Sequence, residues 1–559
     1  MHKEINAMPA TFAPARIFPP AFILLSLAVY WPTRDAGFVM DWLGWQMAYD
    51  RDGWAGVPDS FGYPGLHPVL HLGNYTLYWL FGANSAAWYW IFAALHGLNA
   101  WQLCRLGLRL PLGLSQGQML FISAGAALLF LLSPYAAEVV VWRVCLHYLL
   151  ALLFALLAMH ATLDYLEGSS QRWWLVHLYV LLALFTFEWS LVIPLLVLTL
   201  AGVYIFSKNT NQPPSKLPDY RTGWQTANFK LILPMAALWA VYFLINKIRL
   251  GDWVGHYGAD THLNFSPAPM LANMLRYTLK QFAFLRHWEH GLKTQVAEGL
   301  GQGWPLWLGA GLLIAVFGAW LSFFRRSSAR MRWAGAAFAW FFIALLPVSN
   351  LFFYYLQFSE NDRYGYFASG FGWLGLLLLL SFLPKIGRRL VVLVLVGLSL
   401  CLLNRINYYW AESERLCDSL VDDFRWYDRD EVIILTSPDN YRGVFMFRII
   451  GQINGFNEAL ELRRRRPFPG KMWEAAQYNI TEPDNSFRVE RDSAGLLHKL
   501  VFLQDGGNWW WRNGVGATDY ALDRYDFRTG EWHAEVKLRE KRPNTAIIFP
   551  SGGHWIEVK

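Results

Sequence analysis

The sequence predicts a polytopic α-helical membrane protein of about eleven spans, followed by a C-terminal, extracytoplasmic α+β domain. Composition is the first observation behind this fold class: 55% of the 559 residues are hydrophobic, 17% are aromatic and 16% are charged, whereas a soluble domain carries about 25% charged residues. The second observation is a series of apolar stretches long enough to cross a hydrocarbon core about 30 Å thick. The third is that basic residues gather in every second loop between those stretches, as membrane topology requires.

Eleven apolar stretches are expected to span the membrane, and Glu188 separates two of them that otherwise form one continuous run. The first stretch lacks a small-residue cleavage site after it, so we expect a retained span rather than a signal peptide. The last stretch is short, and ten or twelve spans are alternatives to eleven. The stretches lie near residues 17–33, 84–104, 117–137, 147–163, 173–187, 189–207, 231–246, 303–324, 333–352, 364–384 and 390–404.

The basic residues predict the orientation, because Lys and Arg are retained in short cytoplasmic loops. With the N-terminus inside, the cytoplasmic segments hold sixteen Lys and Arg residues and the short outer segments hold four: Arg34, Arg51, Arg143 and Arg363. An odd number of spans then places the C-terminal tail outside. Topology also explains most of the net charge of +7, so no nucleic-acid partner is expected. The expected location is a membrane, most simply a bacterial inner membrane, with a periplasmic C-terminal domain.

Three outer segments are long enough to carry chemistry. Residues 34–83 are rich in aromatics such as Trp42, Trp45, Trp54 and Trp79, which suits a segment in the headgroup layer. Within residues 249–302, apolar residues recur at intervals of three and four over 268–277. This spacing predicts an amphipathic helix that lies against the bilayer or caps a cavity.

The third outer segment is the tail, so the predicted domains are a multi-span domain over 1–410 and a soluble domain over 411–559. Strands are expected at 432–435, 535–538 and 555–558, with a turn over 436–440. The run of four arginines over 463–466 is expected to be a solvated helix end, with a contact to anionic lipid or phosphate as the alternative.

Motifs of soluble enzymes are missing, since the sequence has no Gly-rich phosphate loop, no His-Glu-x-x-His and no Gly-x-Ser-x-Gly. ATP-driven chemistry is therefore unsupported. The four cysteines imply no disulfide framework. No cluster of His and Asp ligands is evident, so no obligatory metal is expected.

Ionisable residues instead gather at the outer ends of the expected spans. Asp41 follows the first span, Glu138 the third, Glu188 lies between the fifth and sixth, and Asp362 with Arg363 follows the ninth. Independent accidents would scatter over both faces, so one shared outer site is the economical interpretation. For Glu188 the alternative is a hairpin-tip carboxylate that reaches water, and for Glu138 it is a helix cap.

A series of short motifs in this order resembles a known family. The motifs are Phe38-Val39-Met40-Asp41, His67-Pro68-Val69, Phe81-Gly82-Ala83-Asn84, Leu95-His96, Ser133-Pro134 with Glu138 and Trp142, Glu188, Pro347 with Ser349-Asn350, and Arg363 with Tyr366 and Ser369. Over roughly residues 17–385 the chain resembles the membrane-embedded C-type (GT-C) glycosyltransferases that use polyprenyl-phosphate sugars. The nearest branch is that of the transmembrane and tetratricopeptide-repeat O-mannosyltransferases and their bacterial relatives.

The chain departs from the pattern of that family at several positions. The paired Asp-Asp of the family is Asp41-Trp42 here, its Arg-Pro is His67-Pro68, its Lys-Glu is Phe187-Glu188, and the Glu before its Arg is Asp362. The tail also shows no tetratricopeptide repeat.

The resemblance implies a GT-C-like fold and an inverting glycosyltransferase. Its donor would be a polyprenyl-phosphate sugar, its acceptor a hydroxyl on a periplasmic glycan, lipid or protein, and it would need no cofactor. Asp41 would be the general base, and Arg363 the main phosphate ligand. Other expected site residues are His67 and Tyr366 for donor binding and Glu138, Glu188 and Asp362 for shaping the cavity, with Asp362 orienting Arg363.

Two other classes remain open. A glycolipid transporter or flippase would also need charged groups that face a cavity, although nearer the bilayer midplane and in repeated halves. A catalytically silent GT-C-like scaffold is the third class, because the Asp-Asp pair is broken at Trp42.

Overall fold

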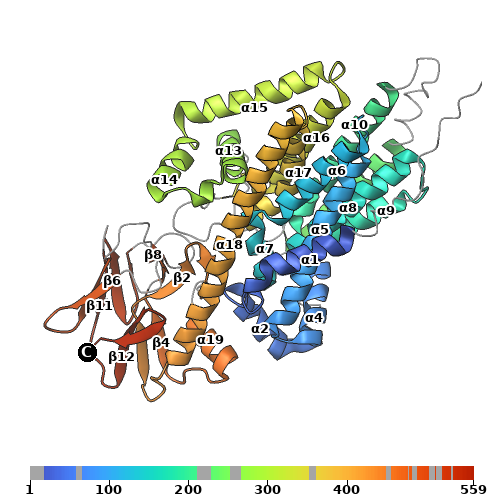
Figure 1. Ribbon diagram of the computed structural model, residues 1–559. Helices are drawn as coiled ribbons and strands as arrows, with labels where there is room; N and C mark the ends of the chain where they lie inside the picture. The colour runs from blue at the N-terminus through green and yellow to red at the C-terminus, as the bar shows by residue number, and fades with distance from the viewer. Residues whose placement is uncertain are drawn as a thin grey trace, which may run out of the picture.

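The computed structural model describes residues 18–57, 66–210, 228–251, 253, 266–351, 361–447, 455–475, 477–480, 487–502, 510–511, 519–530 and 533–558. A bundle of helices is followed by a domain of three sheets at one end of the bundle (Figure 1). The structure therefore fits a membrane protein with a C-terminal α+β domain.

Each of the eleven predicted stretches contains a helix. These helices are α1 (Phe18–Tyr30), α5 (Ser85–Arg109), α6 (Gln116–Leu131), α8 (Leu146–Glu167), α9 (Trp174–Leu184), α10 (Ile193–Thr210), α12 (Leu233–Leu250), α15 (Gly303–Phe323), α16 (Ala329–Ser349), α17 (Arg363–Leu380) and α18 (Lys385–Asp423). By length and composition, six helices among the described residues can cross a membrane, or seven if one bent pair counts as a span. Eleven spans are thus not confirmed.

Four of the helices that are not counted as single membrane spans, α1, α5, α6 and α9, fail for physical reasons. Helices α1 and α9 have 13 and 11 residues, which correspond to about 20 Å and 17 Å of helix, less than the roughly 30 Å core. Helix α5 is long but carries His96, Asn99 and Gln102 on its buried face. Helix α6 ends at Leu131, and the chain turns by 50° into the segment Pro134–Val141.

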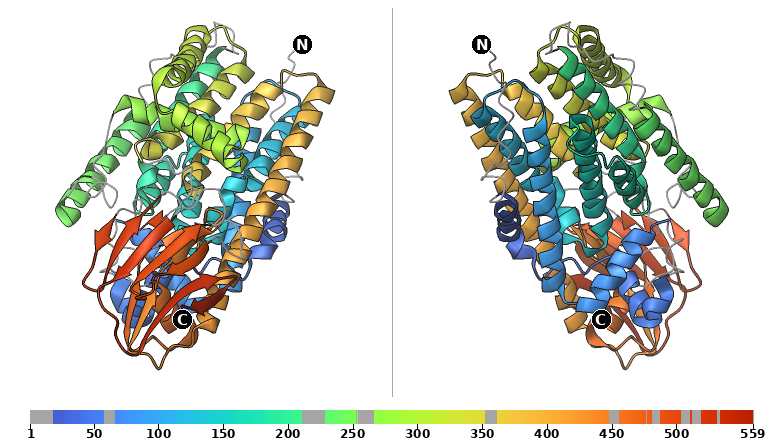
Figure 2. Two further views of the ribbon diagram at one scale, coloured as in Figure 1. Left: turned by 90° about the vertical axis from the view of Figure 1, so that its left-hand side faces the viewer. Right: turned by 90° about the vertical axis from the view of Figure 1, so that its right-hand side faces the viewer.

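Short helices gather at the end of the bundle that meets the sheets, as both views of Figure 2 show for α2 and α4. They are α2 (Asp41–Asp52), α4 (Pro68–Phe81), α7 (Ala137–Val141) and the 3₁₀ turns η4 (Pro134–Ala136), η5 (Arg143–Cys145) and η6 (Glu188–Val192). The aromatics of α2 and α4 divide between two environments. Trp54 and Trp79 are exposed, but Trp42 is fully buried and stacks on Phe38 with ring centroids 4.3 Å apart. Trp42 therefore packs inside the protein, and a position of this segment in the headgroup layer stays a prediction.

The predicted amphipathic helix over 268–277 is confirmed as part of α13 (Pro267–Ala283). Its buried face includes the polar residues Asn273, Lys280 and Gln281, and it packs against α16 and α17. The buried face of α13 therefore packs against other helices of the protein. Helix α14 (His290–Gly299) follows and leads into α15.

The C-terminal domain is built from three sheets. The first has the order β13 (His554–Glu557), β12 (Thr545–Ser551), β1 (Glu431–Ile434) and β4 (Lys471–Glu474), with β12 and β4 parallel to β1. The second is antiparallel, in the order β6 (Phe487–Arg491), β7 (Leu497–Phe502), β11 (His533–Leu538), β10 (Tyr525–Thr529) and β9 (Tyr520–Ala521). The third has the order β3 (Val444–Phe445), β2 (Ser437–Tyr441), β5 (Gln477–Ile480) and β8 (Trp510–Trp511).

The three strands predicted in the tail are confirmed as β1, β11 and β13. The turn predicted over 436–440 is wrong, because these residues form strand β2, which pairs in parallel with β5. Pro and Asn disfavour strands locally, but the partner strand satisfies the backbone here.

Helix α18 joins the two parts of the molecule and passes through residue 410 without a break. Its 39 residues make a helix about 58 Å long, well beyond the roughly 30 Å of a hydrocarbon core. Figure 1 shows it running from the far end of the bundle to the sheets. Its last turns pack against β2, β3, β13 and α19 (Gly455–Arg464).

The arginines at the end of α19 make several contacts, and the prediction of a solvated helix end is wrong for Arg463, whose side chain is 17% exposed. Arg463 pairs with Glu414 of α18. Arg464 donates to the carbonyl oxygens of Val421 and Phe424 near the end of α18. The Arg466 guanidinium lies 3.9 Å from the centre of the Tyr427 ring. Arg464, Arg465 and Arg466 are exposed, as a solvated helix end predicts.

A buried ion pair ties the first two sheets of the C-terminal domain together. Glu431, at the start of β1, receives hydrogen bonds from Arg524 Nε (2.9 Å), Trp473 Nε1 (2.9 Å) and Thr545 Oγ1 (2.9 Å). Burial raises the pKa of Glu431, but the hydrogen bonds from Arg524 and Thr545 outweigh that effect and the pKa is lowered. The carboxylate therefore stabilises the fold above its ordinary pKa range, and this stabilisation is lost as the pH falls.

We expect Arg524→Ala to destabilise the C-terminal domain by about 3–5 kcal/mol at neutral pH, because Glu431 loses its buried cation and keeps only the more exposed Arg542, 3.7 Å away. Urea-dependent proteolysis of the full-length protein, with cleavage sites within 411–559 identified by mass spectrometry, measures the change. Arg528→Ala, an exposed arginine on β10, is the control and should stay within about 0.5 kcal/mol of the wild type. Equal effects of the two substitutions would contradict the assignment.

Candidate functional site

Asp41 is the first residue of α2 and directly follows a residue with strained backbone. Met40 has φ 55° and ψ −123°, a conformation that costs a non-glycine residue about 1–3 kcal/mol. The carboxylate of Asp41 stands at the N-terminus of a helix, where the helix dipole favours a negative charge. The main chain thus holds a carboxylate in place at an energetic cost that the surroundings must offset.

Arg363, the first residue of α17, forms an ion pair with Glu138 in α7. The same carboxylate accepts a hydrogen bond from the backbone N–H of Arg363 over 3.0 Å. Both side chains are largely buried, at 13% and 6% exposed. Glu138 therefore binds the first residue of a second helix, which lies 225 positions later in the sequence. The alternative role as a cap of its own helix does not describe this contact.

Three aromatic rings surround the guanidinium of Arg363. The distances from its Cζ to the ring centres are 4.8 Å for Tyr364, 5.3 Å for Trp142 and 5.7 Å for Phe445. A guanidinium stays charged in such surroundings and stacks well on aromatic faces. Phe445 belongs to the C-terminal domain, so that domain contributes to the environment of Arg363.

Asp362 has different partners from those predicted. Its carboxylate lies 2.8 Å from Lys280 Nζ of α13 and also pairs with Arg286 in the 3₁₀ turn η9 (Leu285–His287). The Asp362 side chain is fully buried. The expectation that Asp362 orients Arg363 is therefore replaced by an ion triad with two cations that sequence reasoning missed.

His67 and Glu188 form a third buried pair. His67 Nε2 lies 2.6 Å from Glu188 Oε2, and His67 precedes α4 while Glu188 begins η6. Because the Glu188 side chain is only 11% exposed, the alternative of a hairpin tip that reaches water is wrong. The Trp189 ring, next to Glu188, lies 5.9 Å from the Tyr364 ring beside Arg363, so this pair borders the Arg363 environment.

The start of α8 is the common neighbour of these groups. The buried Cys145 interacts electrostatically with Glu138, Arg363 and Asp41. His147, two positions later, interacts in the same way with His67, Arg363 and His71. Residues of α2, α4, α7 and α17 therefore lie within electrostatic range of the start of α8.

Tyr366 lies one turn further along α17 and is fully buried. Its hydroxyl is 3.0 Å from His96 Nδ1 and accepts a hydrogen bond from Asn99 Nδ2 over 3.3 Å. Both partners belong to α5, so this hydroxyl joins α17 to α5 inside the bundle. A role for Tyr366 in donor binding stays a prediction.

Sequence reasoning missed Lys280, Arg286, Glu414 and Arg463. A signal existed for two of them. Lys280 follows Tyr277 by three positions on the amphipathic helix, which puts it on the buried face. Glu414 lies between Trp410 and Cys417 at helical spacing, and all three are buried. An ionisable residue on an apolar helical face predicts a buried partner.

Within the part of the chain that the structure describes, no group of three or more His, Cys, Asp or Glu side chains could hold a metal ion. No protein-family model and no curated protein matches the chain. What the site can do chemically therefore follows from its own residues: a carboxylate at a strained turn, a stacked guanidinium and two further buried ion pairs.

We expect Asp362→Ala to lower the stability of the protein by about 3–5 kcal/mol, because Lys280 and Arg286 are left buried without their anion. Thermal unfolding of the full-length protein in detergent measures the effect as a lower Tm. Asp35→Ala is the matched control, since Asp35 pairs with a neighbouring arginine but has a side chain that is 74% exposed. An unchanged Tm for Asp362→Ala would show that the triad adds nothing to stability.

Proposed function

We propose that this chain is an inverting glycosyltransferase of the GT-C type, which moves a sugar from a polyprenyl-phosphate donor to an acceptor hydroxyl at the outer side of the membrane. One observation carries the proposal. The Trp142 ring lies 5.3 Å from the Arg363 Cζ, and Trp142 Nε1 donates to the carbonyl oxygen of Val39, two positions before Asp41, so the guanidinium and the segment that carries the carboxylate border the same side chain. This is the minimum set that such a transfer requires.

Arg363 is proposed to hold the phosphate of the donor. Glu138 already receives a backbone N–H and a guanidinium N–H from Arg363, so this residue offers an anion two donors in a suitable arrangement. Phosphate oxygens accept hydrogen bonds from guanidinium groups and helix N-termini in the same way. A donor phosphate would share or replace the contact with Glu138.

Asp41 is proposed to be the general base. As the acceptor oxygen bonds to the anomeric carbon, its proton moves to the Asp41 carboxylate, and the bond from that carbon to the phosphate oxygen breaks with inversion. The departing phosphate needs charge stabilisation rather than a proton, which Arg363 supplies. No metal and no cofactor enters this scheme.

The remaining predicted residues are given supporting roles. His67 and Glu188 bind each other at 2.6 Å and are proposed to shape the cavity on the side of α4 and η6. Tyr366 is proposed to serve donor binding by holding α17, and with it Arg363, against α5. Asp362 would keep α13 beside the same helix through Lys280.

Reconstitution into liposomes with a panel of labelled polyprenyl-phosphate sugars tests the function. Transfer of label to an added hydroxyl acceptor, with inversion at the anomeric carbon, is the expected result. Movement of the donor between leaflets without transfer would favour a glycolipid transporter, and binding without turnover would favour a scaffold. Bacterial inner-membrane lipids are the first choice of donor, because the proposed location is that membrane with a periplasmic acceptor.

We expect Asp41→Asn to lower the transfer rate by about 10²–10⁴-fold while donor binding is retained, because the amide cannot accept the proton. Asp35→Asn changes an exposed carboxylate six positions earlier and should leave the rate unchanged. Full activity of a stably folded Asp41→Asn protein would show that another group is the base.

We expect Arg363→Ala to weaken binding of the donor lipid by roughly 10- to 100-fold, the range for losing hydrogen bonds to a charged group. Arg363→Lys should lie between this variant and the wild type, because a lysine keeps the charge but lacks the fork. Arg34→Ala, an exposed cation, is the control. Unaltered binding to a folded Arg363→Ala protein would remove Arg363 from the donor site.

A further inference from the structure

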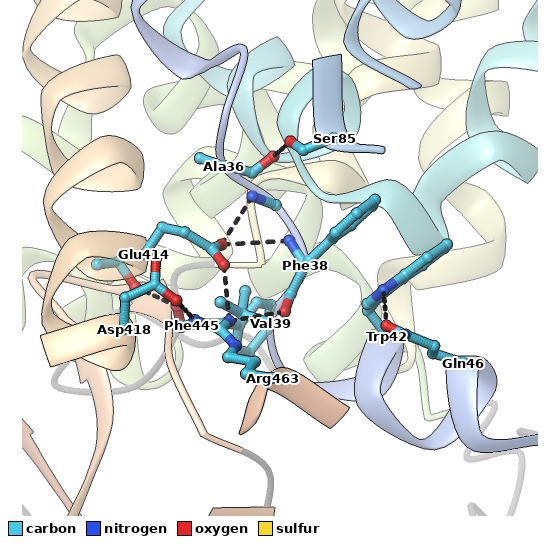
Figure 3. Close-up of polar contacts among 12 residues, drawn as sticks. Ala36, Phe38, Val39, Trp42, Gln46, Ser85, Glu414, Asp418, Phe445 and Arg463 are labelled. Atoms are coloured by element: carbon cyan, nitrogen blue, oxygen red, sulfur yellow. Dashed lines mark hydrogen bonds and ion pairs between the residues drawn. The ribbon is translucent and has the colours of Figure 1, made fainter. Parts of the chain in front are cut away.

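The segment that leads into Asp41 is bound by a residue at the far end of α18. Glu414 Oε2 accepts the backbone N–H groups of Gly37 and Phe38 at 3.0 Å and 3.2 Å (Figure 3). Gly37 has φ +101°, and a Cβ there would lie 1.9 Å from the carbonyl oxygen of Val141. The segment is therefore held in a conformation that only a glycine permits at this position.

Arg463 of α19 completes this arrangement from the C-terminal domain. Its Nη2 lies 2.6 Å from Glu414 Oε1 and 3.1 Å from the carbonyl oxygen of Phe38, and Nη1 pairs with Asp418 (Figure 3). Burial lowers the pKa of Arg463, but the charges of Glu414 and Asp418 outweigh burial and raise it above its ordinary value. The cation is therefore permanent at any physiological pH.

The rest of the segment is bound from both parts of the molecule. The backbone N–H of Met40, the strained residue, donates to the carbonyl oxygen of Met446 at 3.0 Å. On the bundle side, Trp142 Nε1 donates to the Val39 carbonyl at 3.1 Å and the Arg143 N–H donates to the Gly37 carbonyl at 3.2 Å. The C-terminal domain thus supplies the partner for the residue next to Asp41.

The same domain also reaches Arg363. The Phe445 ring lies 4.5 Å from the Trp142 ring and 5.7 Å from the Arg363 Cζ, and Ser413 Oγ of α18 donates a hydrogen bond to the Phe445 carbonyl. Residues 445 and 446 therefore contact the surroundings of the proposed phosphate ligand and of the proposed base at once.

We propose that the C-terminal domain completes the site, with Arg463 as a positioning residue that acts through Glu414 to fix residues 37–40, and hence Asp41, opposite Arg363. The positional part stands on the contacts above, and its catalytic consequence rests on the proposed function. If Arg463 served only to dock α19 against α18, its ion pairs with Glu414 and Asp418 would be sufficient. Arg463 also binds the carbonyl oxygen of Phe38, and the second carboxylate oxygen of Glu414 accepts two backbone N–H groups of the same segment. These additional contacts indicate that Arg463 and Glu414 position the segment over residues 37–40.

Hydrogen exchange of the full-length protein in detergent tests the positional part. In Arg463→Ala, amides in the peptide over 36–41 should exchange on the order of tenfold faster, because the segment loses a charge-assisted partner. Arg463→Lys should recover part of the protection. Arg464→Ala is the matched control, since Arg464 lies next to Arg463 on α19 but binds carbonyl groups near the end of α18.

Unchanged exchange over 36–41 in Arg463→Ala overturns the proposal. Equally fast exchange in Arg464→Ala also overturns it, because the effect would then come from loosened docking of the domain. Partial rescue by lysine, with the control unaffected, supports it.

Turnover with the panel of labelled polyprenyl-phosphate sugars as probes separates this inference from the proposed function. In an active protein, Arg463→Ala should lower kcat about tenfold or more with little change in the donor KM, since a displaced base affects the chemical step. A fully retained kcat would overturn the catalytic consequence. If the wild type shows no transfer with any donor while the exchange result holds, the proposed function fails and the positional inference stands.

Discussion

The contact of Arg463 and Glu414 with residues 37–40 is the interaction on which the rest of the arrangement depends. It joins α18, α19 and the segment before α2, and it satisfies backbone groups that a turn in this conformation leaves without partners. The strained backbone of Met40 persists because its N–H is bound by the Met446 carbonyl. Together with the packing of α19 against α2 and the pair of Arg465 with Asp50, these contacts set where the helix that Asp41 begins lies relative to the C-terminal domain.

Buried charges around this region come in matched groups. Arg363 faces Glu138, Lys280 and Arg286 share Asp362, and His67 faces Glu188. An unpaired ion in such surroundings would cost several kcal/mol, so each pairing restricts which helices can be neighbours. These pairs bind α7 to α17, α13 to α17 and α4 to η6. The charges to which we assign a role in binding a donor phosphate are therefore also among the charges that assemble the region.

Much of the local structure could be predicted from sequence patterns. Apolar runs predicted helices in all eleven stretches, three- and four-residue spacing predicted α13, and runs of β-branched residues predicted β1. Local patterns misled where a distant partner decides the outcome. A turn was predicted over 436–440, but residues 437–440 belong to a strand that pairs with β5. Arg463 was predicted to lie at a solvated helix end, but it binds an acid 49 positions earlier. Eleven spans are not confirmed, because α6 bends and α1 and α9 are short, and a hydropathy pattern reports neither property.

The sequence by itself determined the class of the molecule and the positions of its ionisable residues at the ends of apolar runs, because both follow from local composition. It could not determine which of those residues face each other. That Asp362 binds Lys280 and Arg286 rather than orienting Arg363, and that the C-terminal domain holds the segment before Asp41, was decided by tertiary structure alone. The physical reason is that a buried charge takes the partner which helix packing brings within hydrogen-bonding distance, and separation along the chain carries no information about that distance.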